Sequence, residues 1–407
     1  MAVLPPKSPL EVLQPIWWVG VLSLAAALVV TPIMRFIAYR ARIVDKPDDL
    51  LKPHGRPVAY LGGVAMCIGL VAGLLGFLVA MPDARTHWRS LREALCSGRL
   101  TDLMKNPVWK LLGMLLSSVA IMLVGLIDDI RKITPRQKVC GQVLAAAILY
   151  VGGVGDGMAS MLFSLVGLYP PIYVLLPVRA AMLLVIVIAT CNATNLLDGL
   201  DGLCGGVTGI IALGFLALAT WLGVWGHFPG SDELRVALCL AMAGAVLGFL
   251  PYNIPPASIF MGDAGSMLLG FFVATMMGMF CQEGTVRWFV AAWAVFALPT
   301  LDTALAVVRR LLSGKPIFTG DRSHLYDQLV DRGMTVKQVV GLFYLLAALA
   351  AGIGVTVAIL LRGREAIVLY LVLLVVIWGV FYKKGMIKPE PRKPAGHDDG
   401  PPPERAE

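Results

Sequence analysis

The chain has 407 residues, of which 58% are hydrophobic and 15% are charged, and its formal net charge is +8. Soluble domains carry about 25% charged residues, so the composition excludes an ordinary soluble protein. Apolar runs of about 20 residues recur along the chain, and inside a bilayer only helices satisfy the backbone polar groups of such runs. The sequence therefore predicts an all-α integral membrane protein.

Eleven membrane spans are expected from the lengths of the apolar runs and from the charged, proline or glycine breaks between them. They are 16–39, 61–81, 108–127, 138–155, 177–194, 205–226, 236–252, 265–281, 287–308, 337–361 and 365–382. The stretch 161–176 contains a proline pair and is expected to be a short interfacial element or a hairpin. Residues 1–385 should form one polytopic bundle of about 10–11 transmembrane helices. Residues 386–407, rich in proline and mixed charge, should form a disordered cytoplasmic tail.

The distribution of cations sets the expected orientation. Loops 40–60, 128–138 and 309–337 and the segment after 382 carry most of the 34 Lys and Arg residues. The positive-inside rule places them in the cytoplasm and the N-terminus outside. Loop 82–107 resists this rule, because it is rich in arginine yet falls outside; a miscounted span is the alternative explanation. The loops that follow the first, third, fifth, seventh and ninth spans then share the cytoplasmic face.

The first inner loop alternates Lys52, His54 and Arg56 ahead of the pair Gly62-Gly63. Cationic side chains and glycine backbone N–H groups in this order suit a phosphate. A plain positive-inside anchor for the first span is the structural alternative.

The second inner loop begins with Asp128 and Asp129, at the end of a span. Adjacent carboxylates repel, so at least one tends to keep a raised pKa or to meet a cation. An internal ion pair with Lys132, one turn further on, is the structural reading. We favour a catalytic or metal-facing pair.

The third inner loop reads Asn-Ala-Thr-Asn-Leu-Leu-Asp-Gly-Leu-Asp-Gly over residues 192–202. Asn195, Asp198 and Asp201 recur every three residues and would share one face of a helical turn. Carboxylates beside a bilayer are costly unless they bind something. A metal or a polar ligand is therefore expected here.

The last two inner loops add an aspartate and two cationic side chains. Asp263 lies among glycines at the start of span 265–281, and it suits either an N-cap on the helix or a metal ligand. Arg322 and His324 follow a glycine-containing turn and suit a phosphate or a sugar. Asp302, inside span 287–308, is expected to be structural and to pair with a cation in the bundle.

Together these residue types indicate one chemistry. Carboxylates with asparagine suit Mg²⁺, which is usually held by one or two carboxylates plus substrate phosphates, and the cations suit a diphosphate. No His/Cys spacing suggests zinc, and no P-loop is present. The seven cysteines form no Cys-x-x-Cys pair and are read as packing residues. The net charge follows from the inner loops and does not call for nucleic acid.

The order of these motifs resembles the polyprenyl-phosphate N-acetylhexosamine-1-phosphate transferases over about residues 45–340. The motifs are Asp45-Lys46-Pro47 with Leu61-Gly62-Gly63, Gly125-Leu-Ile-Asp128-Asp129, residues 192–202, Phe260-Met-Gly-Asp263-Ala-Gly-Ser266, and Asp321-Arg322-Ser-His324. The resemblance implies that a polyprenyl phosphate attacks a UDP-amino sugar, that UMP leaves, and that a polyprenyl-diphospho-sugar remains in the membrane. This step would begin the synthesis of a cell-envelope polysaccharide. The resemblance further implies a requirement for Mg²⁺, or for Mn²⁺ in its place, and UDP-N-acetylglucosamine as the default donor.

The resemblance also implies roles for individual residues. Asp263 would be a metal ligand with Asn195 as a second, and Asp128 and Asp129 would deprotonate or orient the lipid phosphate, so that Asp128, Asp129 and Asp263 form the catalytic group. Asp198 and Asp201 would lie at the nucleotide, with Asp201 near the uracil. Lys138, Arg322 and His324 would face the diphosphate, with Lys52, His54 and Arg56 nearby.

The chain departs from the family pattern in two places. The family's His-x-His-His motif matches His324, Leu325, Tyr326 and Asp327 here, so two histidines are missing. The last acid of the family's Asp-Asp-x-x-Asp motif is replaced by Lys132. The first departure puts any role for a histidine cluster, and the identity of the sugar, in doubt.

Two functions of other classes are open to such a chain. An ion-coupled transporter of an anionic solute would also use acids at membrane depth, but these should lie near mid-span within inverted repeats. A catalytically inactive scaffold would not need the set of aspartates. For the transferase, the expected location is the inner membrane of the cell, with the site in the cytoplasm; the sequence leaves the oligomeric state open, and a homodimer is one arrangement that it allows.

Overall fold

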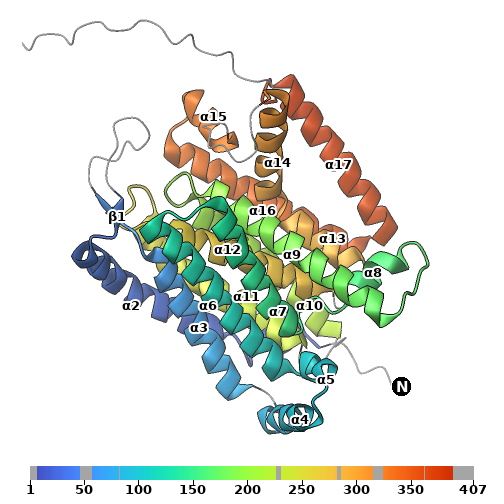
Figure 1. Ribbon diagram of the computed structural model, residues 1–407. Helices are drawn as coiled ribbons and strands as arrows, with labels where there is room; N and C mark the ends of the chain where they lie inside the picture. The colour runs from blue at the N-terminus through green and yellow to red at the C-terminus, as the bar shows by residue number, and fades with distance from the viewer. Residues whose placement is uncertain are drawn as a thin grey trace, which may run out of the picture.

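The computed structural model describes residues 7–45, 57–81, 83–225, 231–281, 286–314, 324–361 and 363–387. Helices make up nearly all of the described chain (Figure 1). They are α1 Pro9–Leu13, α2 Trp18–Ala41, α3 Gly62–Ala80, α4 Ala84–Ser97, α5 Leu100–Lys105, α6 Pro107–Arg131, α7 Pro135–Val151, α8 Met158–Ser164, α9 Ile172–Leu197, α10 Leu203–Trp225, α11 Ser231–Asn253, α12 Gly262–Phe280, α13 Val286–Val295, α14 Ala297–Leu312, α15 Leu325–Asp331, α16 Val336–Leu360 and α17 Gly363–Lys383. Two short strands, β1 Val44–Asp45 and β2 Val58–Ala59, form an antiparallel pair.

Nine of the described helices are long and apolar enough to cross a membrane: α2, α3, α6, α9, α10, α11, α12, α16 and α17. They match nine of the eleven expected spans, so the prediction of an all-α polytopic membrane protein is confirmed. The expected span 138–155 is α7, which has only 17 residues. The expected span 287–308 is a pair of helices, α13 and α14, bent by 72°.

Proline chemistry explains the bend between α13 and α14. Pro299 lies in the first turn of α14, where its missing N–H costs little. Its ring would clash with the carbonyl group four residues earlier, and that residue is Val295, the last of α13. The bend between the two helices relieves this clash, a feature that hydropathy alone does not register.

The two ambiguous segments become short helices. The described part of 82–107 contains α4 and α5, neither of which is long and apolar enough to span, so this segment adds no membrane crossing between α3 and α6. The segment 161–176 contains the end of α8, a turn and the first residues of α9.

Helix α12 lies at the centre of the bundle. Its most apolar 18-residue window is 94% buried, whereas the corresponding window of α17 at the periphery is only 6% buried. Glycines allow neighbouring helices to approach α12 closely: Gly63 of α3 packs on the backbone of Gly265, and Gly125 of α6 packs on the backbone of Asp263. Small residues serve this purpose in membrane bundles, where backbones must approach to gain van der Waals contact.

The short strands tie the start of α3 to the start of α12. Ala59 of β2 bridges Ile259, and the Phe260 N–H donates to the Ala59 carbonyl at 2.8 Å. The Gly62 N–H in turn donates to the Phe260 carbonyl at 3.0 Å. Two helix N-termini are thereby fixed side by side, at the end of the bundle where β1 is labelled in Figure 1.

Candidate active site

A cavity of about 850 Å³ opens at this end of the bundle. Its walls come from the β1–β2 pair, the end of α9 and the loop after it, the loop before α12, and the start of α16. It is lined by Asp45, Tyr60, Asp129, Asn195, Asp198, Gly199, Leu200, Asp201, Asn253, Pro255, Pro256, Phe260, Gly262, Asp263, Thr335, Val336 and Lys337. Five of the expected site residues thus meet at one cavity, although their sequence positions run from 129 to 263.

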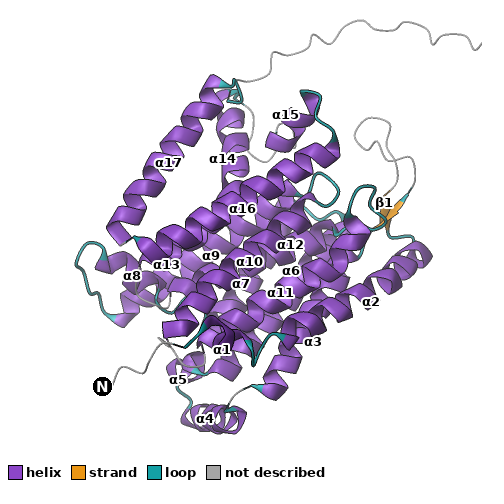
Figure 2. Ribbon diagram, turned by 180° about the vertical axis from the view of Figure 1, so that it is seen from behind, coloured by secondary structure: helices purple, strands orange, loops and turns teal. Residues whose placement is uncertain are grey.

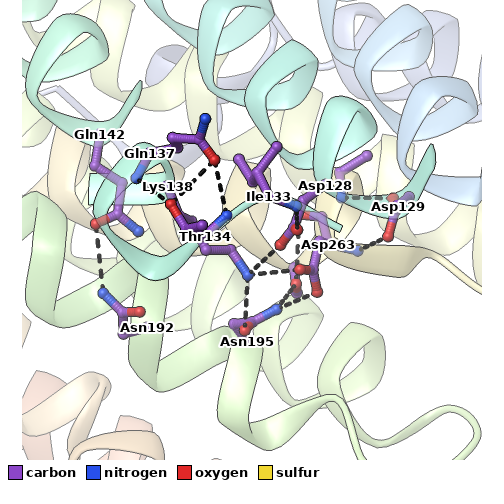
Figure 3. A network of polar contacts seen from close by, with 12 residues as sticks. Asp128, Asp129, Ile133, Thr134, Gln137, Lys138, Gln142, Asn192, Asn195 and Asp263 are labelled. Atoms are coloured by element: carbon purple, nitrogen blue, oxygen red, sulfur yellow. Dashed lines mark hydrogen bonds and ion pairs between the residues drawn. The ribbon is translucent and has the colours of Figure 1, made fainter. Parts of the chain in front are cut away.

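Lys138 joins two aspartates and an asparagine from three helices beside this cavity (Figure 3). Its ammonium lies 2.8 Å from an Asp128 carboxylate oxygen and 2.5 Å from Asp263 Oδ2. It also donates to Asn195 Oδ1 at 3.4 Å. Because Lys138 begins the second turn of α7 while the others come from α6, α9 and α12, this network holds four helix ends together.

Asn195 presents its amide nitrogen to Asp263. Its Nδ2 donates to Asp263 Oδ1 at 2.6 Å and to Ser266 Oγ at 2.9 Å, and its Oδ1 faces Lys138. A metal ligand must offer the oxygen, so binding by Asn195 would use the oxygen that faces Lys138 here or would require the amide to turn.

Asp129 caps helix α12. Its two carboxylate oxygens accept from the Asp263 N–H at 2.8 Å and the Ala264 N–H at 3.1 Å. The sequence left open whether Asp263 itself is the N-cap; the structure gives that position to a carboxylate from α6 instead. The favourable interaction of an anion with the helix N-terminus is therefore supplied by Asp129, and the Asp263 side chain faces Lys138 and Asn195.

The structural reading of the Asp128-Asp129 pair was an ion pair with Lys132. Asp128 instead meets Lys138, and its other oxygen accepts from the Ile133 N–H at 2.9 Å. Lys132 is exposed and adopts a left-handed backbone with φ of 48°, which ends α6.

Asp198 and Asp201 lie in the loop between α9 and α10. Burial, together with the carboxylates of Asp263, Asp129 and Asp201, raises the pKa of the Asp198 carboxyl well above its usual range. Asp201 Oδ2 accepts from the Ala257 N–H at 2.9 Å, which fixes this loop against the segment before α12. A cation bound among these carboxyl groups would favour their ionised forms.

His324 is buried away from the cavity. Its Nδ1 lies 2.9 Å from Asp302 Oδ2, and the other Asp302 oxygen accepts from the Leu325 N–H at 2.6 Å. Asp302 is therefore structural as expected, and its partner is the histidine ring. The His324 ring stacks on Tyr326 at 5.5 Å between centroids, and the Tyr326 hydroxyl donates to the Leu196 carbonyl at 3.1 Å. This arrangement, which we call the α15 brace, connects Asp302, His324 and Tyr326 to the end of α9.

Four predicted site residues lie outside the described residues: Lys52, His54, Arg56 and Arg322. So does nearly all of the expected tail, 388–407.

The structure also adds residues that sequence reasoning missed. Lys337 and Thr335, at the start of α16, line the cavity, as do Tyr60 and Asn253. Asn253 is buried and accepts from the Gly202 N–H at 3.0 Å, so it shapes the loop that carries Asp201. Thr335 and Gln338 form a capping box. This motif predicts the start of a helix from the sequence but does not indicate a cavity.

The donor set fits Mg²⁺. The cavity is lined by five aspartates and one lysine, and the Lys138 ammonium already lies between two of the site carboxylates, Asp128 and Asp263, as a cation would. Among the described residues, no three His, Cys, Asp or Glu side chains form a ready-made metal site. Mg²⁺ in proteins is usually held by one or two carboxylates and completed by water and substrate phosphates.

Known proteins are similar in sequence to this chain over most of its length. A family model described as glycosyl transferase family 4 matches residues 111–280. The chain is 31% identical over 355 residues to a decaprenyl-phosphate N-acetylglucosaminephosphotransferase of Mycobacterium tuberculosis, covering 83% of this chain and 82% of the relative. It is 28% identical over 328 residues to a probable undecaprenyl-phosphate N-acetylglucosaminyl 1-phosphate transferase of Bacillus subtilis, covering 80% of each. A phospho-N-acetylmuramoyl-pentapeptide-transferase of Moorella thermoacetica is 31% identical over 360 residues, which is 84% of this chain and 97% of the relative.

Proposed function

Because the chain belongs to glycosyl transferase family 4, the polyprenyl-phosphate N-acetylhexosamine-1-phosphate transferases, we propose that it transfers a sugar 1-phosphate from a UDP-amino sugar to a polyprenyl phosphate. The products would be a polyprenyl-diphospho-sugar and UMP, and the lipid product would begin a cell-envelope polysaccharide. One observation carries this proposal beyond the family match. The Asp128–Lys138–Asp263 network lies at helix ends beside an open cavity, where a soluble nucleotide and a membrane lipid can both reach it.

The reaction needs alignment and charge neutralisation more than covalent help from the protein. A phosphate oxygen of the lipid attacks the sugar-linked phosphorus, and the bond to UMP breaks, with UMP keeping the electron pair. Asp128 would orient the lipid phosphate or accept its remaining proton. Lys138 would neutralise charge that develops on the transferring phosphoryl group.

Asp263 would hold Mg²⁺, with Asn195 as the second ligand. The ion would supply neutralisation of the diphosphate oxygens. Asp129 would keep Asp263 in place through the α12 backbone, and Asp198 and Asp201 would bind the nucleoside. Lys337, which also lines the cavity, would add a cation for the diphosphate. Arg322, Lys52, His54 and Arg56 remain proposed contacts on the sequence pattern alone.

N-acetylglucosamine is the proposed sugar, because the relatives from Bacillus and Mycobacterium carry it in their names. The match to a phospho-N-acetylmuramoyl-pentapeptide-transferase is of similar strength, so a panel of donors decides between them. His324 is buried against Asp302, which supports a positioning role for this residue rather than contact with the sugar.

The proposal includes a location: the inner membrane, with the cavity facing the cytoplasm, where nucleotide sugars are made. A homodimer is compatible with it. An ion-coupled transporter is disfavoured, because the acids lie at helix ends on one side of the bundle rather than at mid-span.

A purified-enzyme assay tests the function. Polyprenyl phosphate and UDP-N-acetylglucosamine should give UMP and a lipid-linked sugar only when Mg²⁺ or Mn²⁺ is present, and EDTA should stop the reaction reversibly. Full turnover in EDTA would overturn the metal proposal. Donor uptake into sealed proteoliposomes without release of UMP would favour the transporter instead.

A further inference from the structure

Helix α4 lies at the end of the bundle opposite the cavity. Helix α3 begins at the cavity with Gly62 and runs for 19 residues, or about 28 Å, before α4 follows. Helix α6 then returns from Pro107 to the site acids. Figures 1 and 2 show α4 across this end of the bundle, close to end-on, while α3 runs lengthwise. The element thus lies at the height of the opposite membrane surface.

Asn106 fastens α4 to the start of α6. Its side-chain oxygen accepts from the Val108 and Trp109 N–H groups at 2.9 and 3.2 Å, and so caps α6. Its Nδ2 donates to the His87 carbonyl at 3.0 Å and to Ser90 Oγ at 2.8 Å. These bonds fix the rotation of α4 about its own axis.

The side chains of α4 are grouped by polarity into stripes along the helix. At about 100° per residue, Leu91 and Ala94 form the buried stripe against the bundle. Trp88 and Leu95 border it and remain 46% and 55% exposed.

The next stripe around the helix contains Arg85, Arg89 and Arg92, all exposed. The remaining face is polar, with Ser90, Glu93 and Ser97. Going around the helix from the buried stripe, the order is therefore apolar, basic and polar, so that the apolar and polar faces point in opposite directions, as in a helix lying at a bilayer surface.

We propose that α4 is an interfacial anchor that binds the headgroup phosphates of anionic phospholipids through Arg85, Arg89 and Arg92, with Trp88 and Leu95 in the apolar boundary below. Arginine suits this position, since its fork binds phosphate oxygens while its aliphatic stem lies along apolar groups. Tryptophan is enriched at the same depth of a membrane.

A lipid surface fits this face better than a second copy of the chain. In a two-fold contact the arginine stripe would face the same stripe of the partner, and like charges would repel. The spans already hold α4 beside the headgroups, so lipid contact needs no further association. The arginines of 82–107 then act as lipid ligands rather than as signals for the orientation of the chain, which explains why this loop opposes the positive-inside rule.

Two measurements on the full-length protein test the anchor. Trp88 fluorescence is isolated by subtracting the emission of Trp88→Phe from that of the wild type in nanodiscs. Brominated phosphatidylcholine should quench this difference. Native mass spectrometry from mixed phosphatidylcholine and phosphatidylglycerol micelles should show several-fold less retained phosphatidylglycerol for Arg85→Gln/Arg89→Gln/Arg92→Gln.

The matched control is Arg85→Lys/Arg89→Lys/Arg92→Lys, which keeps the charge and should retain lipid close to the wild type. Equal retention by all three proteins, or an unquenched Trp88 difference, would overturn the proposal. The quenching experiment decides the matter if the glutamine variant fails to fold. Cross-linking between Cys96 residues of two copies of the wild type would assign the face to a dimer instead. None of these readouts depends on the proposed transferase activity.

Discussion

Asp263 and Asp302 both lie in helices beside the same end of the bundle, yet their surroundings differ. Asp302 is 2% exposed, and His324 and the Leu325 N–H use both of its oxygens. The Asp263 side chain is 30% exposed and lines a cavity with four other aspartates. A carboxylate whose hydrogen bonds all go to protein groups holds a local arrangement in place. A carboxylate surrounded by other carboxyl groups in an open cavity is suited to bind a cation.

The largest difference between the two aspartates should appear on replacing Asp263. Asp263→Asn keeps the size of the side chain but removes the charge that would hold Mg²⁺, and turnover should fall on the order of 10³-fold. Steady-state rates at saturating Mg²⁺ check this, with size-exclusion behaviour as the control for folding. A rate within tenfold of the wild type would remove Asp263 from the metal site.

Lys138 offers a second test that does not need turnover. Lys138→Met leaves Asp128 and Asp263 facing each other without their counter-ion, so the two carboxylates repel. The thermal midpoint should fall in EDTA and recover on addition of Mg²⁺, by a larger step than in the wild type. Turnover should also fall, by about 10²-fold, because the transferring phosphoryl group loses a cation. A Mg²⁺ response equal to that of the wild type would contradict the proposed site.

Replacing Asp302 should lower the stability of the protein more than its activity. Asp302→Ala leaves the Leu325 N–H and the His324 ring without a buried partner, at a cost of about 1–3 kcal/mol in the free energy of unfolding. The thermal midpoint should fall with or without Mg²⁺, while kcat should change by less than tenfold. A loss of activity as large as that of Asp263→Asn would show that the two aspartates do not divide in this way.

Replacing Tyr326 should have the smallest effect of these substitutions. Tyr326→Phe keeps the stacking on His324 and removes one hydrogen bond to the Leu196 carbonyl, worth about 1 kcal/mol. Because Leu196 lies between Asn195 and Asp198, we expect a few-fold fall in kcat with little change in the thermal midpoint. His324→Ala, which disturbs the α15 brace more broadly, should exceed it in both measurements.

Much of the site was readable from motif order. The sequence predicted that residues around 129, 195, 198, 201 and 263 serve one site, and the structure brings them to one cavity. It could not assign Asp129 to the cap of α12, because that bond joins residues 134 positions apart. It also could not find Lys337, since a lysine two residues into a helix resembles any other surface cation.

The membrane spans, like the site, could be predicted from the sequence only in part. Run length predicted nine helices correctly, because the cost of bare backbone in lipid is a local property of the sequence. It missed the break at Phe296, since hydropathy does not register the clash between Pro299 and the carbonyl of Val295.

The sequence alone thus determined the class of the protein, most of its helical spans and the types of residue that serve one site. These features depend on the apolar and charged residues within each segment, which can be read from the chain directly. Only the tertiary structure decided which carboxylate caps a helix, which meets Lys138, and which is closed off by His324. Those assignments depend on distances between helix ends far apart in the chain, and these distances follow from the glycine-mediated packing of α3 and α6 on α12.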